Sequence, residues 1–161
     1  RKVCVGEDVS VWRDETGRVH TEEGKALRFR GNSRIVELSG RAGECKFGKL
    51  RIQWRIVRKR GASLPARSAG RELFDADTVG SPVLLRRWQP GDRFQPICLA
   101  QPAKLQDLFT NARIPRARRR ELVVALAADG RIFWVEGLRI GEPFKLTPRT
   151  NRRLQWRWQR L

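Results

Sequence analysis

The stretch KLRIQWRIV, residues 49–57, alternates polar and apolar side chains from Lys49 to Ile56. Its apolar members are Leu50, Ile52, Trp54 and Ile56, and the residues between them are arginine and glutamine. A period of two is that of a β-strand with one face buried and the other face in water. This stretch therefore predicts a strand with an apolar inner face and a basic outer face.

Much of the remaining sequence gives the same kind of signal. VSVWR and RVH, residues 9–13 and 18–20, flank a predicted turn at 14–17, and RIVELS, residues 34–39, predicts another strand. PVLLRRW at 82–88 and RLQWRWQ at 153–159 are also predicted strands. ELVVALA and RIFWVEG, joined by the turn ADG at 128–130, predict a second hairpin.

One segment, PAKLQDLFTNA at residues 102–112, has helical periodicity. Leu105, Leu108 and Phe109 have the i, i+3, i+4 spacing of one helix face, and Pro102 suits a first helical turn. A second short helix is expected to start at Pro115. The predicted fold class is α+β, dominated by strands, with a short helical pair inserted between them.

A Gly-, Ala-, Ser- and Pro-rich stretch at residues 61–70 is the best candidate for a linker. It divides the chain into a β-rich N-terminal part, residues 1–69, and a C-terminal part, residues 70–161. The second part contains the predicted helical pair and the densest group of arginines, and we expect it to be the binding domain.

The chain is strongly basic, with 35 Lys and Arg against 17 Asp and Glu and a formal net charge of +18. The excess is spread along the whole chain, and most of the cations are arginine. The planar guanidinium fork of arginine matches phosphate in a bidentate way. This balance points to a polyanionic partner, most simply a nucleic acid.

Other classes of protein are disfavoured by what the sequence lacks. No apolar run approaches the roughly 20 residues of a membrane span, so no membrane partner is expected. Cys4, Cys45 and Cys98 are widely separated and form no CxxC pair, which argues against a metal site and favours a reducing cytoplasm. Because the chain has no methionine and no leader, we expect it to be a fragment of a longer protein.

We expect no catalytic residues and no metal ligands in this chain. Its one histidine, His20, falls beside the predicted first hairpin, and the phosphate-loop, HExxH and GxSxG motifs are missing from the sequence. Asp75 and Asp77 could hold a metal in principle, but a helix or turn cap is the better interpretation of two carboxylates alone.

Two basic segments stand beside structure-breaking residues. In RRWQPGDRF, residues 86–94, a Pro-Gly turn groups Arg86, Arg87 and Arg93, either as phosphate contacts or as solvated side chains. In RIPRARRR, residues 113–120, a helix starting at Pro115 would place Arg116, Arg119 and Arg120 on one face, beside an N-terminus that attracts anions. Like charges at this spacing repel, which favours phosphate contact over a solvated face. Trp88 could contact RNA, although a core position is preferred.

The order of these motifs resembles the C-terminal domain of bacterial tRNA(Ile)-lysidine synthetase, over about residues 72–150. The matching positions are Arg86, Pro90, Gly91, Asp92 and Arg93 in the first motif; Lys104, Leu105, Asp107 and Phe109 in the second; Ile114, Pro115 and Arg119 in the third; and Gly130, Trp134, Val135, Gly137, Leu138 and Arg139 in the last. FDAD at 74–77 and KLTPRT at 145–150 also have counterparts in the family. The sequence departs from the family at Ala103 and Arg113, where lysine is usual, at Cys98, where glycine is usual, and at Val123, where proline is usual.

The resemblance implies a β-sandwich-like fold of the kind shared with the phenylalanyl-tRNA synthetase β chain. It also implies that the full-length protein uses ATP with Mg to adenylate the wobble cytidine of an isoleucine tRNA, which lysine then attacks to give lysidine. The SGGxDS loop of the family lies in a catalytic domain that this sequence lacks. The chain itself would need no cofactor, would be inactive alone, and would bind the tRNA acceptor stem.

Seven residues are predicted to contact RNA. They form two neighbouring patches, Lys104, Arg113, Arg116 and Arg119 in one and Arg86, Arg93 and Arg139 in the other. Two alternatives stay open, a generic RNA- or DNA-binding β module and a structural domain that supports a catalytic partner. The sequence does not indicate which bases are read or the oligomeric state.

Overall fold

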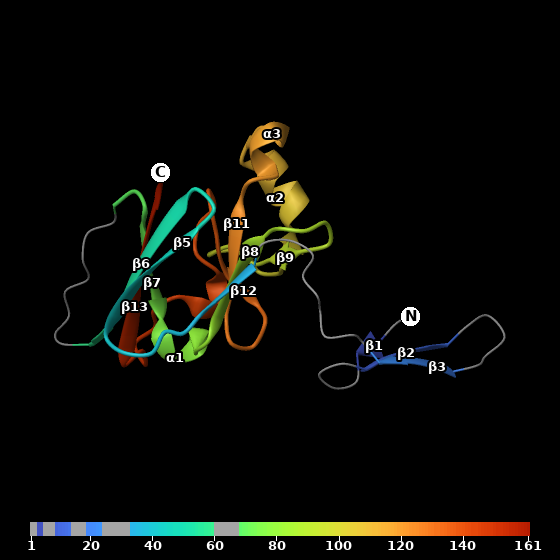
Figure 1. Cartoon of the computed structure of the whole chain (residues 1–161), viewed down its shortest axis with the longest axis horizontal. Coiled ribbons are helices and arrows are strands. Elements are labelled where there is room, and N and C mark those ends of the chain that lie inside the picture. Colours follow the sequence, from blue (N-terminus) through green and yellow to red (C-terminus); the bar gives the residue numbers. More distant parts are fainter. Residues whose placement is uncertain (1–2, 5–8, 14–18, 24–32, 60–67) are drawn as a thin grey trace. The chain divides into compact units, whose positions relative to one another are not determined.

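The computed structural model of the chain describes residues 3–4, 9–13, 19–23, 33–59 and 68–161, and of the first three ranges only the backbone (Figure 1). It divides into two compact units, Arg1–Arg30 and Gly31–Leu161. In the first unit, β1 (Val3–Cys4), β2 (Val9–Arg13) and β3 (Val19–Glu23) form an antiparallel sheet in which β2 is central. The strands of the predicted first hairpin are confirmed, while its turn lies outside the described residues.

The second unit contains two antiparallel sheets of four strands each, which we call sheet I and sheet II. Sheet I has the order β5 (Ala42–Phe47), β6 (Leu50–Arg58), β13 (Arg152–Arg160), β7 (Arg71–Asp75). Sheet II has the order β12 (Ile132–Val135), β11 (Val123–Leu126), β8 (Val83–Arg87), β4 (Ser33–Val36). The strand-dominated α+β class is confirmed.

The longest ladder in the molecule joins β6 to β13, from the pair Leu50 and Arg160 to the pair Arg58 and Arg152. Both strands alternate in the same phase, so that Trp54 lies opposite Trp156 on the buried side. This pairing, together with that of β4 and β8, joins residues from both sides of residue 70. The compact unit therefore begins near Gly31, and the boundary expected at residue 70 falls inside it.

The core between the two sheets is aromatic. The ring of Trp156 in sheet I lies 5.4 Å from Phe133 and 5.9 Å from Trp134 in sheet II, measured between ring centroids. Phe74 of β7 meets Phe133 edge to face at 5.0 Å. All four side chains are fully buried, and such pairs contribute about 0.5–1.5 kcal/mol each beyond their area burial. The expectation that Trp54 and Trp134 belong to the core is confirmed.

A second apolar cluster covers the other face of sheet II. It joins the helix α2 (Leu105–Asn111) to β11 and includes Leu105, Phe109, Val124 and Leu126. Every residue of β11 is buried because its side chains alternate between the two clusters. Sheet II is thus covered on both faces, and α2 and the following α3 (Arg116–Arg119) project from one end of it (Figure 1).

The predicted helical pair is present, but its first helix starts three residues later than Pro102. Ala103 and Lys104 form the short strand β10 (Ala103–Lys104), which pairs with β9 (Arg93–Phe94), so the helix begins at Leu105. At its end, the amide of Ile114 donates to the Phe109 carbonyl at 2.9 Å and that of Arg113 to the Thr110 carbonyl at 3.0 Å. This is a Schellman end, with Arg113 in the left-handed position at φ 55°.

Asp75 caps the one-turn helix α1 (Ala76–Val79), as the sequence predicts. Its Oδ1 accepts hydrogen bonds from the amides of Asp77 and Thr78, both at 3.0 Å, and its Oδ2 accepts one from the Thr150 hydroxyl at 2.6 Å. No cluster of metal-ligating side chains occurs within the described residues, and none of the helices described there is long and apolar enough to cross a membrane.

The carboxylate of Asp75 should make the stability of the fold depend on pH. Burial acts to raise its pKa, but the hydrogen bonds from Thr150, Thr78 and Asp77 outweigh burial and lower that pKa below its ordinary value. A lowered folded-state pKa adds stability that is complete above about pH 5 and is lost as the pH falls through the folded-state value. We expect the unfolding free energies of wild type and Asp75→Asn to differ at pH 7 and converge towards pH 2; parallel curves would contradict this role.

Cys98 occupies a backbone conformation that favours glycine, with φ 72°. A side chain in the left-handed region costs about 1 kcal/mol, which is the physical reason to expect glycine at such a position. Cys98→Gly should raise the unfolding free energy by about this amount in chemical denaturation. The neighbouring Ala100→Gly is the control, because Ala100 has no positive φ and should lose stability instead.

Candidate nucleic-acid interface

The Pro-Gly corner at residues 86–94 is built around a buried ion pair. Arg86, whose side chain is 9% exposed, donates from Nη1 and Nη2 to the two carboxylate oxygens of Asp92 at 2.8 and 2.9 Å. The same carboxylate accepts the amide of Gln89 at 2.8 Å and so closes the turn. Removing one partner of a buried pair costs about 3–5 kcal/mol. The structure thus gives Arg86 the role of holding the corner together.

Trp88 ties this corner to the helical pair. Its Nε1 donates to the backbone carbonyl of Arg119, and its ring lies edge to face on Phe109 at 5.2 Å between centroids. The side chain is only partly exposed and packs against the apolar cluster beneath α2. The preference for a packing role over RNA contact is therefore consistent with its position.

Arg93 and Lys104 are brought together by the β9–β10 ladder. They are directly opposite residues of the two strands, and both are exposed. Arg93 also donates to the carbonyl of Pro102 at 2.9 Å, which fixes the direction of its guanidinium. Like charges that face each other across a ladder are destabilising unless an anion lies between them. These two cations, which were predicted to lie in separate patches, are therefore neighbours in the structure.

Arg119 turns inward and closes the connection between α2 and α3. Its Nε donates to the Ile114 carbonyl at 2.8 Å and its Nη1 to the Thr110 hydroxyl at 3.2 Å. The helix α3 is a single turn, with Pro115 as its N-cap and four helical residues. A helix this short has no appreciable dipole, so the predicted anion-attracting N-terminus at Pro115 is not present. The positive charge around α3 comes from its arginine side chains.

Six exposed cations lie on or beside the two helices, and we call this set of residues the arginine corner. Its members are Arg93, Lys104, Arg113, Arg116, Arg118 and Arg120. Within the described part of the chain, none of these six makes an ion pair with a carboxylate. Asp92 and Glu121 are already bonded to arginines, and Asp107 of α2 makes no ion pair with any residue that the structure describes.

Four of the seven predicted contact residues belong to this corner, and the other three lie elsewhere. Arg86 and Arg119 are bonded to protein groups, and Arg139 is exposed in the segment after β12. The corner also contains Arg120, which was expected on the same helix face as Arg116, and Arg118, which the sequence did not single out. Ideal helical spacing grouped Arg116 with Arg119 and Arg120, and it could not show that Arg119 turns back onto the protein.

The comparisons with known proteins agree on one family. A family model described as the TilS substrate C-terminal domain matches residues 83–156. The tRNA(Ile)-lysidine synthase of Clostridium acetobutylicum is 36% identical over 89 residues, which cover 55% of this chain and 19% of that protein. The tRNA(Ile)-lysidine synthase of Clostridium tetani is 25% identical over an alignment that covers 93% of this chain and 36% of that protein.

A solved crystal structure of a TilS C-terminal domain is also similar. It has a TM-score of 0.64 and 25% sequence identity to this chain, and the similarity covers 81% of this chain and 98% of that one. The stretch matched by the family model runs from the start of β8 into β13 and so contains the whole arginine corner. The chain therefore carries a domain that matches the TilS C-terminal domain in both sequence and fold.

Proposed function

We propose that the Gly31–Leu161 unit binds tRNA, at the acceptor stem, through the arginine corner. The observation that carries the proposal is a group of six exposed cations that have no ion-pair partner among the described residues, in a domain whose relatives are named for a tRNA. Such a cluster repels itself, and a phosphate backbone is the partner that would offset the repulsion.

The chemistry of the corner suits the backbone of duplex RNA more than its bases. Double-helical RNA keeps its base edges in a deep, narrow major groove and presents phosphates and 2′-hydroxyls outside. Arginine and lysine on short, rigid elements match that arrangement, since the β9–β10 ladder and the Schellman end fix the backbone from which they project. We therefore infer that the domain reads shape and phosphate position rather than base sequence.

The activity of the whole protein is a further step of the proposal. The chain spans 19% of the length of the Clostridium acetobutylicum relative and 36% of the Clostridium tetani relative. We infer that the full-length protein, in the cytoplasm, uses ATP with Mg to attach lysine to the wobble cytidine of isoleucine tRNA. ATP and lysine would bind a catalytic domain outside this sequence, and this chain alone would have no ligase activity.

A matched pair of double variants tests the arginine corner. Lys104→Ala with Arg116→Ala removes two exposed cations of the corner, and Arg55→Ala with Arg157→Ala removes two from the outer face of sheet I. Both pairs change the net charge equally. Only the first should weaken binding to an isoleucine-tRNA acceptor-stem minihelix, and it should flatten the plot of log K against log salt by about 0.9 for each lost phosphate contact.

The same binding experiment separates this proposal from the two alternatives, a generic nucleic-acid-binding module and a structural domain. Equal losses from both double variants, together with equal binding to duplex DNA, would indicate a nonspecific polyanion surface. Failure of the wild-type chain to bind minihelix or whole tRNA at moderate salt would leave a structural domain that supports its catalytic partner.

Arg113 allows stability and binding to be separated. It sits at φ 55°, where glycine is favoured, and its side chain is exposed. Arg113→Gly should raise the unfolding free energy by about 1 kcal/mol because it relieves backbone strain. The same variant should bind the minihelix more weakly and with a shallower salt dependence. If its binding matched that of the wild type, Arg113 would have no place in the interface.

A further inference from the structure

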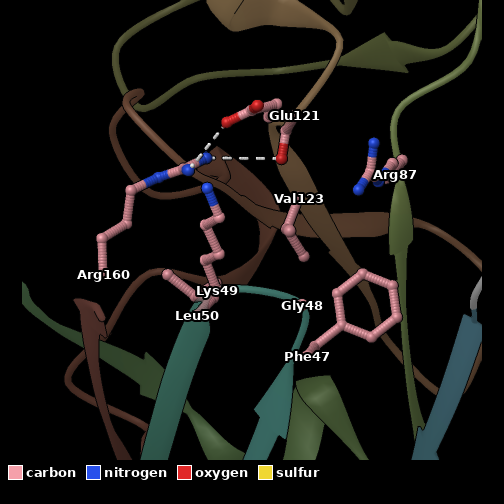
Figure 2. Close-up of a pocket in the computed structure, with 8 residues that line it drawn as sticks. All are labelled: Phe47, Gly48, Lys49, Leu50, Arg87, Glu121, Val123 and Arg160. Carbon is pink, nitrogen blue, oxygen red and sulfur yellow. Dashed lines mark hydrogen bonds and ion pairs between the residues drawn. The ribbon is translucent and has the colours of Figure 1, made fainter.

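A small pocket opens at the end of the sandwich, between the two sheets. Its polar walls are Lys49 from the β5–β6 turn, Arg87 at the end of β8, Glu121 before β11 and Arg160 at the end of β13. The buried side chains of Phe47 and Val123 also line it. Figure 2 shows Lys49 and Arg160 on one side of the pocket and Arg87 on the other.

The carboxylate of Glu121 is held in a fixed position at this pocket. Its Oε2 accepts a hydrogen bond from Nη1 of Arg160 at 3.1 Å, and its backbone carbonyl accepts one from Nη2 at 3.4 Å (Figure 2). Arg160 is itself anchored by Glu136, which is 3% exposed and bonds to both Nε and Nη2. These hydrogen bonds, those to Glu136 first, raise the pKa of Arg160 above its ordinary value.

The pocket offers both donors and an acceptor to a ligand. Lys49 and Arg87 make no ion pair among the described residues, and the one hydrogen bond of the Arg87 side chain goes to the Arg120 carbonyl at 3.4 Å. The acceptor that the pocket offers is Oε1 of Glu121, which accepts no hydrogen bond within the described structure. A phosphate alone would satisfy the cations but would be repelled by Glu121. A ligand that carries a hydroxyl group beside a phosphate would satisfy all three side chains.

The size of the pocket narrows the choice of ligand. Its volume is about 100 Å³, well below the roughly 300–1,000 Å³ of sites that enclose a drug-sized molecule. A nucleobase with its sugar would not be enclosed, whereas a phosphate with the edge of its sugar would. In RNA the 2′-hydroxyl lies next to the 3′-phosphate, and a carboxylate is a known acceptor for a ribose 2′-hydroxyl.

The pocket adjoins the arginine corner. Glu121 directly follows Arg120, and Arg87 is bonded to the Arg120 carbonyl. A single RNA strand whose phosphates cross the corner could therefore continue into the pocket. We propose that this pocket binds one ribose–phosphate unit of that strand, with Lys49 and Arg87 on the phosphate and Glu121 accepting the 2′-hydroxyl. This inference rests on the proposed RNA binding and adds the means by which the domain tells RNA from DNA.

The test compares a minihelix RNA with its 2′-fluoro counterpart of the same sequence. The fluoro sugar keeps the A-form but cannot donate a hydrogen bond, so the wild-type chain should bind the RNA about 3- to 10-fold more tightly. Glu121→Ala should bind both forms alike, because it removes the acceptor that distinguishes the hydroxyl from the fluorine. Lys49→Ala, in an exposed turn, should weaken both forms equally and reduce the salt slope, while Lys46→Ala, outside the pocket, is the matched control.

Thermal unfolding of each variant shows whether the Arg160 network survives the substitution. If the wild type binds both minihelices equally, or if Lys49→Ala behaves as Lys46→Ala does, the pocket has no part in RNA recognition, and the binding proposed for the arginine corner stands. If the wild type binds neither minihelix, both proposals are wrong.

Discussion

The pairing of β6 with β13 is the interaction on which the rest of this structure depends. It joins two nine-residue strands from opposite ends of the unit, and its buried side aligns Trp54 with Trp156. That alignment places Trp156 against Phe133 and Trp134, and so sets how sheet I packs on sheet II. The same ladder carries Arg160 to the end of the sandwich, where it holds Glu121 beside the arginine corner.

Arginine has two distinct roles in this domain, and the position of the carboxylates decides between them. Arg86 and Arg160 are bonded to Asp92, Glu136 and Glu121, and these pairs fix the corner and the pocket. Because those carboxylates are occupied internally, they do not neutralise the exposed arginines beside them. The positive surface therefore has two causes, the excess of basic residues and the pairing of the neighbouring carboxylates with Arg86 and Arg160.

Features that cost stability gather at the same corner. Arg113 holds a left-handed backbone, and Arg93 faces Lys104 across a two-residue ladder. Each of these arrangements persists because the apolar cluster beneath α2 and the hydrogen bonds around it fix the local backbone. Such strain is more readily explained by a binding role than by folding, and it supports the placement of the interface here.

Patterns within the sequence were enough to predict the local structure, and the charge balance was enough to suggest a polyanionic partner. Alternation in residues 49–57 and 153–159, the turn at 128–130 and the spacing of Leu105 and Phe109 depend on near neighbours, and the strands and helix they predict are present. Charge composition likewise indicated a polyanion. Which arginines are free was settled by tertiary contacts, because the bonded ones can take partners distant in the sequence, as Arg160 does with Glu136 and Glu121. The helix start at Leu105 was likewise decided by a non-local ladder with β9, which periodicity within residues 102–112 could not reveal.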